Sequence, residues 1–254
     1  MRLDQLLVQR DLAPSRERAQ ALILAGAVRV DGDRADRAGA PVSDDASVVV
    51  DGGKTYVSRG GDKLAGALDA VALDVRGRVA VDLGSSTGGF TDVLLQRGAA
   101  RVHAVDVGKG QLAWSLRNDS RVFVHEGVNA REGIPVEEPV DLIVADVSFI
   151  SLRLVLPPAL ERLRPGGDVV ALVKPQFEAG RSAVGKGGIV KEAAARADAV
   201  LAVARELATR GVPVIAVTPS ALRGRDGNRE IFVHARRGAR QMGGVEDAVR
   251  EAAR

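Results

Sequence analysis

The sequence predicts an α/β protein in two parts, a doubly wound parallel sheet preceded by a small α+β domain. From residue 61 onward, strand-like apolar runs alternate with helical periods, which is the pattern of a parallel sheet covered by helices. The run at 169–173 is apolar throughout, as expected of a strand that is buried on both faces. The first 50 residues lack this alternation. We therefore expect domains at 1–50 and 61–254, joined by a linker at 51–60.

The small domain is predicted to form two helices followed by a short sheet. An apolar stripe over residues 3–8 predicts the first helix, and Ser15 is a suitable N-cap for a second helix that Gly26 ends. Valine-rich runs at 28–30 and 48–50 predict two strands, with a tight-turn signal directly after the first. Two helices and then a small sheet make an α+β pattern.

The larger domain is predicted to contain seven strands. We expect strands at 78–83, 101–106, 122–125, 140–145, 168–173, 212–217 and 231–236, and helices at 62–72, 88–97, 110–117, 150–163, 191–210 and near 245–254. The residues between 217 and 231 are rich in Gly and Arg and show no helical period, so the last two strands should form an antiparallel pair. Such a sheet resembles the Rossmann-like core of adenosylmethionine-dependent methyltransferases.

Composition excludes several classes of protein. The chain has no cysteine, so it cannot contain a disulfide, a Cys-ligated zinc site or a thiol nucleophile. No apolar stretch approaches the roughly 20 residues of a membrane span, and the N-terminus has no signal-peptide pattern. No clustered His and Asp spacing suggests a metal site. The formal charge of +3 permits a nucleic-acid partner without requiring one. We expect a soluble, cytoplasmic monomer.

A glycine-rich turn after the first strand of the larger domain predicts a nucleoside cofactor. Ser86 stands where a pyrophosphate-binding turn has its second glycine, and Asp82 would repel phosphate but tolerate a cationic ligand. Asp106, at the end of the next strand, can accept both ribose hydroxyls. Asn129 either binds the adenine edge or is an ordinary turn residue. The predicted cofactor residues of the turn are Gly84, Ser85, Ser86, Thr87, Gly88, Gly89 and Phe90.

Four charged residues are expected to meet at one edge of the sheet. Asp146 and Lys174 each follow a predicted strand, and the carboxyl ends of parallel strands form the ligand crevice in such sheets. Glu230 precedes the final strand, whose start lies at the same edge if that strand is antiparallel. Lys63 begins the first helix of the domain. Asp146 is also a candidate cofactor contact. The three histidines fall within strands, so none of them fits this site.

At these residues the sequence resembles a known family. Lys63, Asp146, Lys174 and Glu230 occur in the order of the Lys-Asp-Lys-Glu tetrad of FtsJ-type ribose methyltransferases. The whole chain resembles the TlyA family, historically called hemolysin A, in the segments VSRGGDKL, DLGSSTGGFTDVLL, DVGKGQLAWSLRND, ADVSFISL, VKPQFE and GNREIF. Its first 50 residues resemble the S4 RNA-binding domain.

The resemblance implies an enzymatic activity. It implies transfer of a methyl group from S-adenosyl-L-methionine to the 2′-oxygen of cytidine in ribosomal RNA, with ribosomal subunits as partners. Two roles for Lys174 remain open: it can act as the base, or it can steer the hydroxyl and stabilise the developing alkoxide.

Basic side chains mark the expected RNA surface. In the small domain the candidates are Arg2, Arg10, Arg16, Arg18 and Arg29, and in the rest of the chain they are Arg59, Arg181, Lys186 and Arg225. A solvated helix face is the alternative for the first group. The segment 176–191 is either a flap over the RNA strand or a disordered loop. Phe149 or Phe177 either stacks on an extruded base or belongs to the core.

Two other functions remain as alternatives. A membrane-active hemolysin is suggested only by the older family name, and the sequence shows neither a span nor a strongly amphipathic basic helix. A non-catalytic ribosome assembly factor would keep the fold without the chemistry. The complete tetrad favours the enzyme over both.

Overall fold

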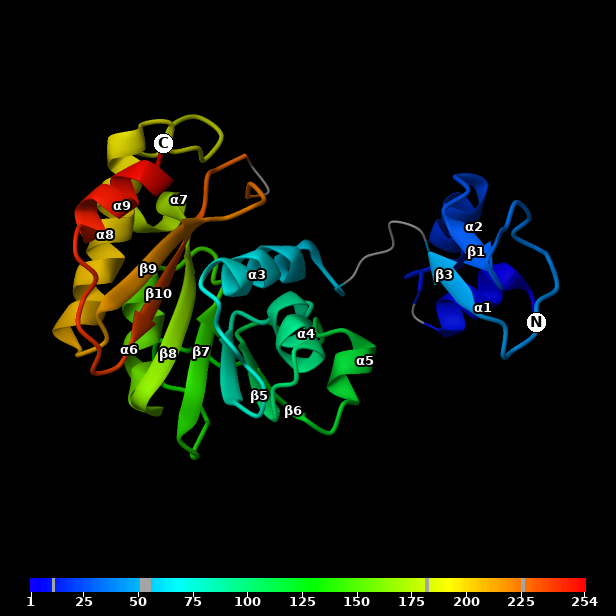
Figure 1. The fold of residues 1–254 in the computed structure, drawn as a ribbon, viewed down its shortest axis with the longest axis horizontal. Helices are drawn as coiled ribbons and strands as arrows, with labels where there is room; N and C mark the ends of the chain where they lie inside the picture. Colours follow the sequence, from blue (N-terminus) through cyan, green and yellow to red (C-terminus); the bar gives the residue numbers. More distant parts are fainter. Residues whose placement is uncertain (11, 51–55, 181–182, 225–226) are drawn as a thin grey trace. The chain divides into compact units, whose positions relative to one another are not determined.

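The computed structural model describes residues 1–10, 12–50, 56–180, 183–224 and 227–254. The chain divides into two compact units, Met1–Thr55 and Tyr56–Arg254 (Figure 1). Each unit has its own buried core, and each is described separately below. None of the helices in these described ranges is both long and apolar enough to cross a membrane.

The small unit packs two helices against a three-stranded antiparallel sheet. Its elements are α1 (Leu3–Gln9), α2 (Arg16–Leu24), β1 (Val28–Val30), β2 (Asp33–Arg34) and β3 (Val48–Val50), with strand order β2-β1-β3. Ser15 caps α2 as expected, because its hydroxyl accepts a hydrogen bond from the backbone N–H of Arg18 at 3.3 Å. The stripe on α1 is buried. Strand β2 was not expected, since it is short and polar.

The larger unit is built on one seven-stranded sheet. Its strands are β4 (Val79–Leu83), β5 (Arg101–Asp106), β6 (Val122–Glu126), β7 (Val140–Ala145), β8 (Leu163–Val173), β9 (Val214–Pro219) and β10 (Ile231–Arg236), in the order β6-β5-β4-β7-β8-β10-β9. The strands β4 to β8 pair in parallel, whereas β10 pairs antiparallel with both β8 and β9. The expected antiparallel pairing of the last two strands is confirmed.

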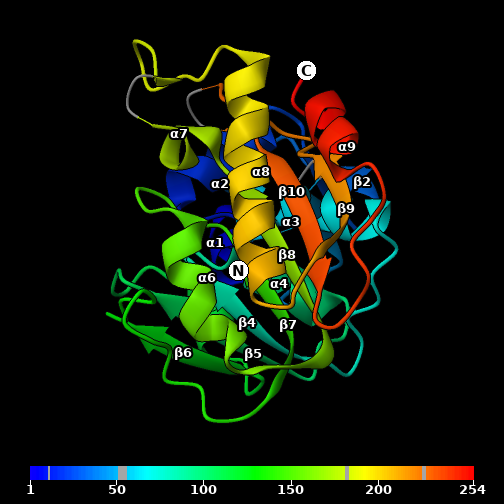
Figure 2. The same cartoon turned by 90° about the vertical axis from the view of Figure 1, so that its left-hand side faces the viewer.

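Helices cover both faces of this sheet. They are α3 (Arg59–Ala70), α4 (Gly89–Gln96), α5 (Trp114–Arg117), α6 (Leu152–Leu160), α7 (Pro175–Glu178), α8 (Ala193–Thr209) and α9 (Val245–Ala252). Helices α6 and α8 lie across the face that Figure 2 turns toward the viewer, and α3 and α4 lie on the opposite face. Strand residues alternate between the two cores: Val81 packs on the α6–α8 side, and Ala80 packs on the α3–α4 side.

Several element bounds differ from those predicted. Helix α3 begins at Arg59, inside the segment expected to be a linker. The helix expected at 150–163 is shorter, and β8 starts at Leu163, with an irregular register between Val140 and Leu142 of its partner strand. Only Trp114–Arg117 of the helix expected at 110–117 is helical. The apolar pattern marks buried positions but does not fix the bounds of an element: Gly166, which has a positive φ, lies inside β8.

Candidate active site

Lys174 and Asp146 meet at the carboxyl edge of the sheet. Asp146 directly follows β7 and Lys174 directly follows β8, and the Lys174 Nζ lies 2.6 Å from the Asp146 Oδ1. The same Nζ donates a hydrogen bond of 2.8 Å to the hydroxyl of Ser148. The side chains of Lys174 and Asp146 are only 11% and 20% exposed, so water screens this ion pair weakly.

Lys63 and Glu230 form a second buried ion pair at this edge. The Lys63 Nζ lies 2.5 Å from the Glu230 Oε2, and the two side chains are 11% and 3% exposed. Ile231 of β10 pairs with Val173 of β8, so the residues just beyond them, Glu230 and Lys174, leave neighbouring strands at the same end. The structure thus brings the four predicted charged residues to one edge as two ion pairs.

The predicted glycine turn joins β4 to α4 beside this edge. Gly84 and Gly88 have φ values of 81° and 97°, which other residues rarely adopt. A Cβ at Gly84 would lie 2.8 Å from the backbone oxygen of Asp146. The turn therefore packs directly against the residue that follows β7, and only glycine fits at this position.

Asp82 is fully buried beneath the turn. Its Oδ2 accepts hydrogen bonds from the backbone N–H and the hydroxyl of Thr91, at 2.9 and 2.7 Å. Within the described residues its Oδ1 has no partner. Burial, together with the negative charges of Asp146 and Asp106, raises the pKa of this carboxyl to about 7. The raised pKa means that the ionised carboxylate is unfavourable in this environment, and a cationic ligand group beside Asp82 would stabilise it.

Asp106 holds the cofactor turn and the loop after β5 together. Its Oδ2 accepts from the backbone N–H of Ser86 at 2.7 Å, and its Oδ1 accepts from Gly108 at 2.7 Å. Ser86 itself has a positive φ of 47°. Each carboxylate oxygen keeps a second lone pair, so the group can also accept hydrogen bonds from a ligand.

The remaining predicted cofactor residues differ in what they offer. The side chain of Phe90 is buried and stacks on Phe232, so it belongs to the core. Ser85 is buried, whereas Ser86 and Thr87 are exposed. Asn129 bonds Glu132 and the backbone N–H of Arg131, and these contacts are those of a turn asparagine. The exposed residues Ser86 and Thr87 of the turn, the unpaired Asp82 Oδ1 and Asp106 together are the groups that suit a nucleoside carrying a cationic group.

Comparisons with known proteins identify the family of this chain. A family model described as FtsJ-like methyltransferase matches residues 56–237, and an S4 domain model matches residues 1–48. The chain belongs to the FtsJ-like methyltransferase family. This FtsJ-like chain is 51% identical to the 16S/23S rRNA (cytidine-2'-O)-methyltransferase TlyA of Mycobacterium tuberculosis, over 99% of the chain and 96% of that protein.

Two further relatives of this FtsJ-like chain carry the older name. Hemolysin A of Brachyspira hyodysenteriae is 38% identical over 92% of the chain and 99% of its own length. A solved structure from Streptococcus thermophilus, described as a hemolysin, has a TM-score of 0.73 at 40% identity and covers 99% of this chain and 95% of that one. These similarities extend over both units.

Beside the tetrad, the FtsJ-like unit carries an aromatic pair, of which Phe149 is exposed and Phe177 half-buried. Phe149 has a φ of 64° and is 91% exposed, and its ring lies 5.2 Å from that of Phe177 at an angle of 49°. The interpretation of Phe149 as a core residue is therefore wrong. Glu178, which the sequence did not single out, accepts hydrogen bonds from the hydroxyl of Ser151 and the backbone N–H of Leu152 at 2.5 and 2.6 Å. It ties α7 to the start of α6.

The predicted flap of the FtsJ-like unit is anchored at its far end. The buried Asn228 accepts from the backbone N–H of Val190 at 3.0 Å and donates to the carbonyl of Gly188 at 2.9 Å. The buried Arg196 donates to the carbonyl of Val190 at 3.1 Å. Asn228 lies in the segment GNREIF but was given no role there, and Arg196 lies in none of the quoted segments. Lys186 is exposed. The predicted RNA contacts Arg181 and Arg225 lie outside the described residues.

A buried carboxylate organises the arginines of the small unit. Asp4 accepts two hydrogen bonds of 3.0 Å from Arg2 and one of 3.2 Å from Arg16, while half of each arginine side chain stays exposed. Arg10 instead donates to the carbonyls of Ala46 and Asp44 and so holds a loop.

The other predicted RNA contacts lie at the surface. Arg18 and Arg29 are exposed, and Arg59 donates to the carbonyl of Arg223. No group of His, Asp and Glu side chains in the described part of the chain is arranged to hold a metal ion.

Proposed function

We propose that this protein transfers a methyl group from S-adenosyl-L-methionine to the 2′-oxygen of a cytidine in ribosomal RNA. One observation carries the proposal: the Lys174–Asp146 pair lies at the carboxyl edge of the sheet, next to the turn that fits a nucleoside. The 51% identity to a relative named for this reaction supports the choice of acceptor. A methyltransferase fold alone would not identify the group that accepts the methyl group.

The residues present fit the proposed cofactor. The turn exposes Ser86 and Thr87, Asp106 can accept the ribose hydroxyls, and the buried Asp82 has a carboxylate oxygen without a partner among the described residues, whose charge favours a cationic group nearby. When bound, S-adenosyl-L-methionine supplies an electrophilic methyl group on a sulfonium. No cluster of metal ligands is needed for this reaction. The tasks of the protein are therefore to bind, orient and stabilise charge.

Lys174 is proposed to act as a donor rather than as a base. Two acceptors, the Asp146 carboxylate and the Ser148 hydroxyl, already lie within 2.8 Å of its Nζ. The Nζ donates one N–H to Ser148, whereas the Asp146 Oδ1 contacts it as an ion pair and has no hydrogen-bond partner among the described residues, so N–H groups remain for the acceptor oxygen of the substrate. Lys174 then orients the 2′-hydroxyl and stabilises negative charge on that oxygen, while the proton of the hydroxyl passes to the neighbouring Asp146 carboxylate and from there to water.

Lys63 and Glu230 are proposed to line the substrate site opposite the Lys174–Asp146 pair. Their ion pair is almost fully buried, so it forms a fixed wall rather than a flexible surface contact. Orientation of this kind contributes strongly to a displacement reaction, because the reacting atoms must lie about 3–3.5 Å apart in line.

Ribosomal subunits are the proposed substrate, and a cytoplasmic monomer is the proposed form of the enzyme. Asp4 presents Arg2 and Arg16 as a fixed pair with exposed guanidinium groups, which suits contacts to RNA phosphates. The S4 domain match over residues 1–48 supports this role for the small unit. The exposed Phe149 ring suits stacking of the target base after extrusion from its helix.

The proposal is tested by identifying the product. Unmethylated ribosomal subunits would be incubated with the protein and S-adenosyl-L-methionine, and the RNA would be digested to nucleosides for mass spectrometry. We expect 2′-O-methylcytidine to accumulate. A methyl group on the base, or no transfer to either subunit, would contradict the proposal.

A further inference from the structure

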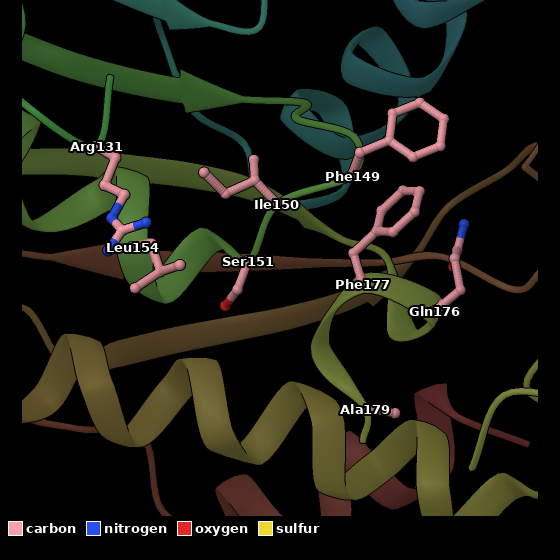
Figure 3. A pocket seen from close by; sticks show the side chains of 8 residues that line it. All are labelled: Arg131, Phe149, Ile150, Ser151, Leu154, Gln176, Phe177 and Ala179. Carbon is pink, nitrogen blue, oxygen red and sulfur yellow. The ribbon is translucent and has the colours of Figure 1, made fainter. Parts of the chain in front are cut away.

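A pocket of about 530 Å³ lies beside the tetrad, between α6, α7 and the loop that follows β6 (Figure 3). Its lining includes the rings of Phe149 and Phe177, the aliphatic side chain of Leu154, the amide of Gln176 and the guanidinium of Arg131. Pockets for small ligands have volumes of about 300–1,000 Å³, so this one has room for more than a single water or ion.

The pocket has one end near the catalytic residues and one end away from them. Phe149 directly follows Ser148, which bonds Lys174, and the backbone N–H of Phe177 donates to the carbonyl of Lys174 at 2.9 Å. Leu154 lies on the first turn of α6, and Figure 3 shows it with Arg131 at the end opposite to Gln176. The aromatic end is therefore the one that adjoins Lys174.

The chemistry of the lining suits an unstacked nucleotide. Aromatic and aliphatic side chains bind the faces of bases, and a guanidinium binds phosphate. Within the described ranges the Arg131 guanidinium has no carboxylate partner. The Oε1 of Gln176 is buried without a hydrogen-bond partner among those residues, which is costly unless a ligand or a water supplies a donor. Phe149 keeps a left-handed backbone conformation that is unfavourable for a bulky residue.

We propose that the Arg131–Leu154 end of this pocket binds the nucleotide next to the target cytidine on the same RNA strand. Leu154 contacts the base of that nucleotide, and Arg131 contacts its phosphate. This inference rests on the proposed function, since it takes RNA as the substrate. The target ribose lies at Lys174, so its own base, which is directly attached, reaches the aromatic end of the pocket. The far end is then left for the adjacent nucleotide.

Site-specific crosslinking tests this assignment. The photoreactive amino acid p-benzoylphenylalanine would replace Leu154, and in a control variant it would replace Phe123 on the edge strand β6. The two side chains are 44% and 43% exposed, so both positions tolerate a large group equally well. After irradiation with ribosomal subunits, primer extension would map each crosslink. We expect the Leu154 variant to crosslink to a nucleotide adjacent to the methylated cytidine, and the Phe123 variant to give no crosslink there.

A second variant keeps the inference testable if the bulky residue disturbs binding. Arg131→Ala should raise KM for the ribosomal subunit about tenfold while kcat and the affinity for S-adenosyl-L-methionine stay unchanged. Arg162→Ala, which removes another exposed arginine just beyond α6, should change none of the three. Crosslinks confined to the methylated cytidine or to distant RNA, or an unchanged KM for Arg131→Ala, would overturn the inference. Failure of the wild-type protein to methylate RNA would instead overturn the proposed function.

Discussion

The ammonium of Lys174 donates one hydrogen bond to Ser148 and forms an ion pair with Asp146, and the proposed chemistry uses an N–H that neither contact occupies. Lys174→Ala removes the group that orients the 2′-hydroxyl but leaves the glycine turn and Asp106 in place. We expect methyl transfer to fall by about 10²- to 10⁴-fold. The affinity for S-adenosyl-L-methionine should stay within twofold. Transfer of a labelled methyl group and calorimetric titration of the cofactor, in the same preparation, measure both quantities.

Arg250→Ala serves as the control for this variant, because Arg250 lies on α9, is largely exposed and pairs with Glu246 at the surface. It should retain the catalytic rate of the wild-type protein. If Lys174→Ala also turned over at the wild-type rate, Lys174 would have no role in the reaction.

Asp82 makes cofactor affinity depend on pH. Burial raises the pKa of its carboxyl to about 7 in the protein without ligand, so the group is mostly protonated at pH 6 and mostly ionised at pH 8. A ligand with an ammonium group favours the ionised form. The affinity for S-adenosyl-L-methionine should therefore rise by up to about tenfold from pH 6 to pH 8.

Asp82→Asn provides the comparison for the pH dependence of binding. The amide keeps the shape of the side chain but carries no charge at either pH. We expect this variant to bind the cofactor more weakly at pH 8 and with an affinity that no longer changes between pH 6 and pH 8. Parallel pH profiles for the two proteins would show that Asp82 is not the titrating group.

Three of the four charged residues of the site could be predicted from sequence because each stands at the end of a strand; the fourth, Lys63, lies on α3. Asp146 and Lys174 follow apolar runs that are easily recognised, and the order of strands brings such ends to one edge. The exposed position of Phe149 could not be predicted, since a positive φ in a non-glycine residue leaves no mark in the sequence. The contact of Ser148 with Lys174 likewise depends on a loop conformation that no local pattern encodes.

Among the helices, α6 and α7 are joined by one buried carboxylate. Glu178 accepts from the backbone N–H of Leu152 and from the hydroxyl of Ser151, and burial raises its pKa. Glu178→Ala leaves a helix N–H without a partner. We expect the free energy of unfolding to fall by about 1–3 kcal/mol, measured by urea denaturation. Glu161→Ala, at the exposed C-cap of α6, should change it by less than about 0.5 kcal/mol.

If the Glu178→Ala and Glu161→Ala variants had the same free energy of unfolding, Glu178 would not anchor α6.

The bounds of α6 also show where sequence reasoning was limited. The pattern predicted a helix over 150–163, but helical structure is confined to Leu152–Leu160. Its apolar positions were visible in the sequence. Its start is set by Ser151 and by Glu178, a residue far along the chain, and long-range contacts of this kind are absent from any local window.

For the whole molecule, we propose that RNA affinity comes mainly from the small unit. Arg2→Ala and Arg16→Ala each remove one exposed guanidinium that Asp4 holds in place. Each change should weaken binding to ribosomal subunits and lower the slope of log affinity against log salt by about 1. Cofactor affinity should not change, because the cofactor turn belongs to the larger unit. Filter binding over a series of salt concentrations measures the slope.

Arg37→Ala is the matched control for these two variants. Arg37 belongs to the same unit and is highly exposed, and its ion pair with Asp36 lies at the surface. Its loss should leave the salt slope unchanged. Equal slopes for all three variants and the wild-type protein would mean that the Asp4-held pair does not contact phosphate.

The central claim is that the tetrad and the cofactor turn enclose one reaction centre at the carboxyl edge of the sheet. A crystal structure of the protein with S-adenosylhomocysteine tests this claim most directly. We expect the nucleoside to lie against the glycine turn, with Asp106 at its ribose hydroxyls and its sulfur facing the space between the Lys174–Asp146 and Lys63–Glu230 pairs. A ligand bound elsewhere, or a sulfur pointing away from Lys174, would contradict the account.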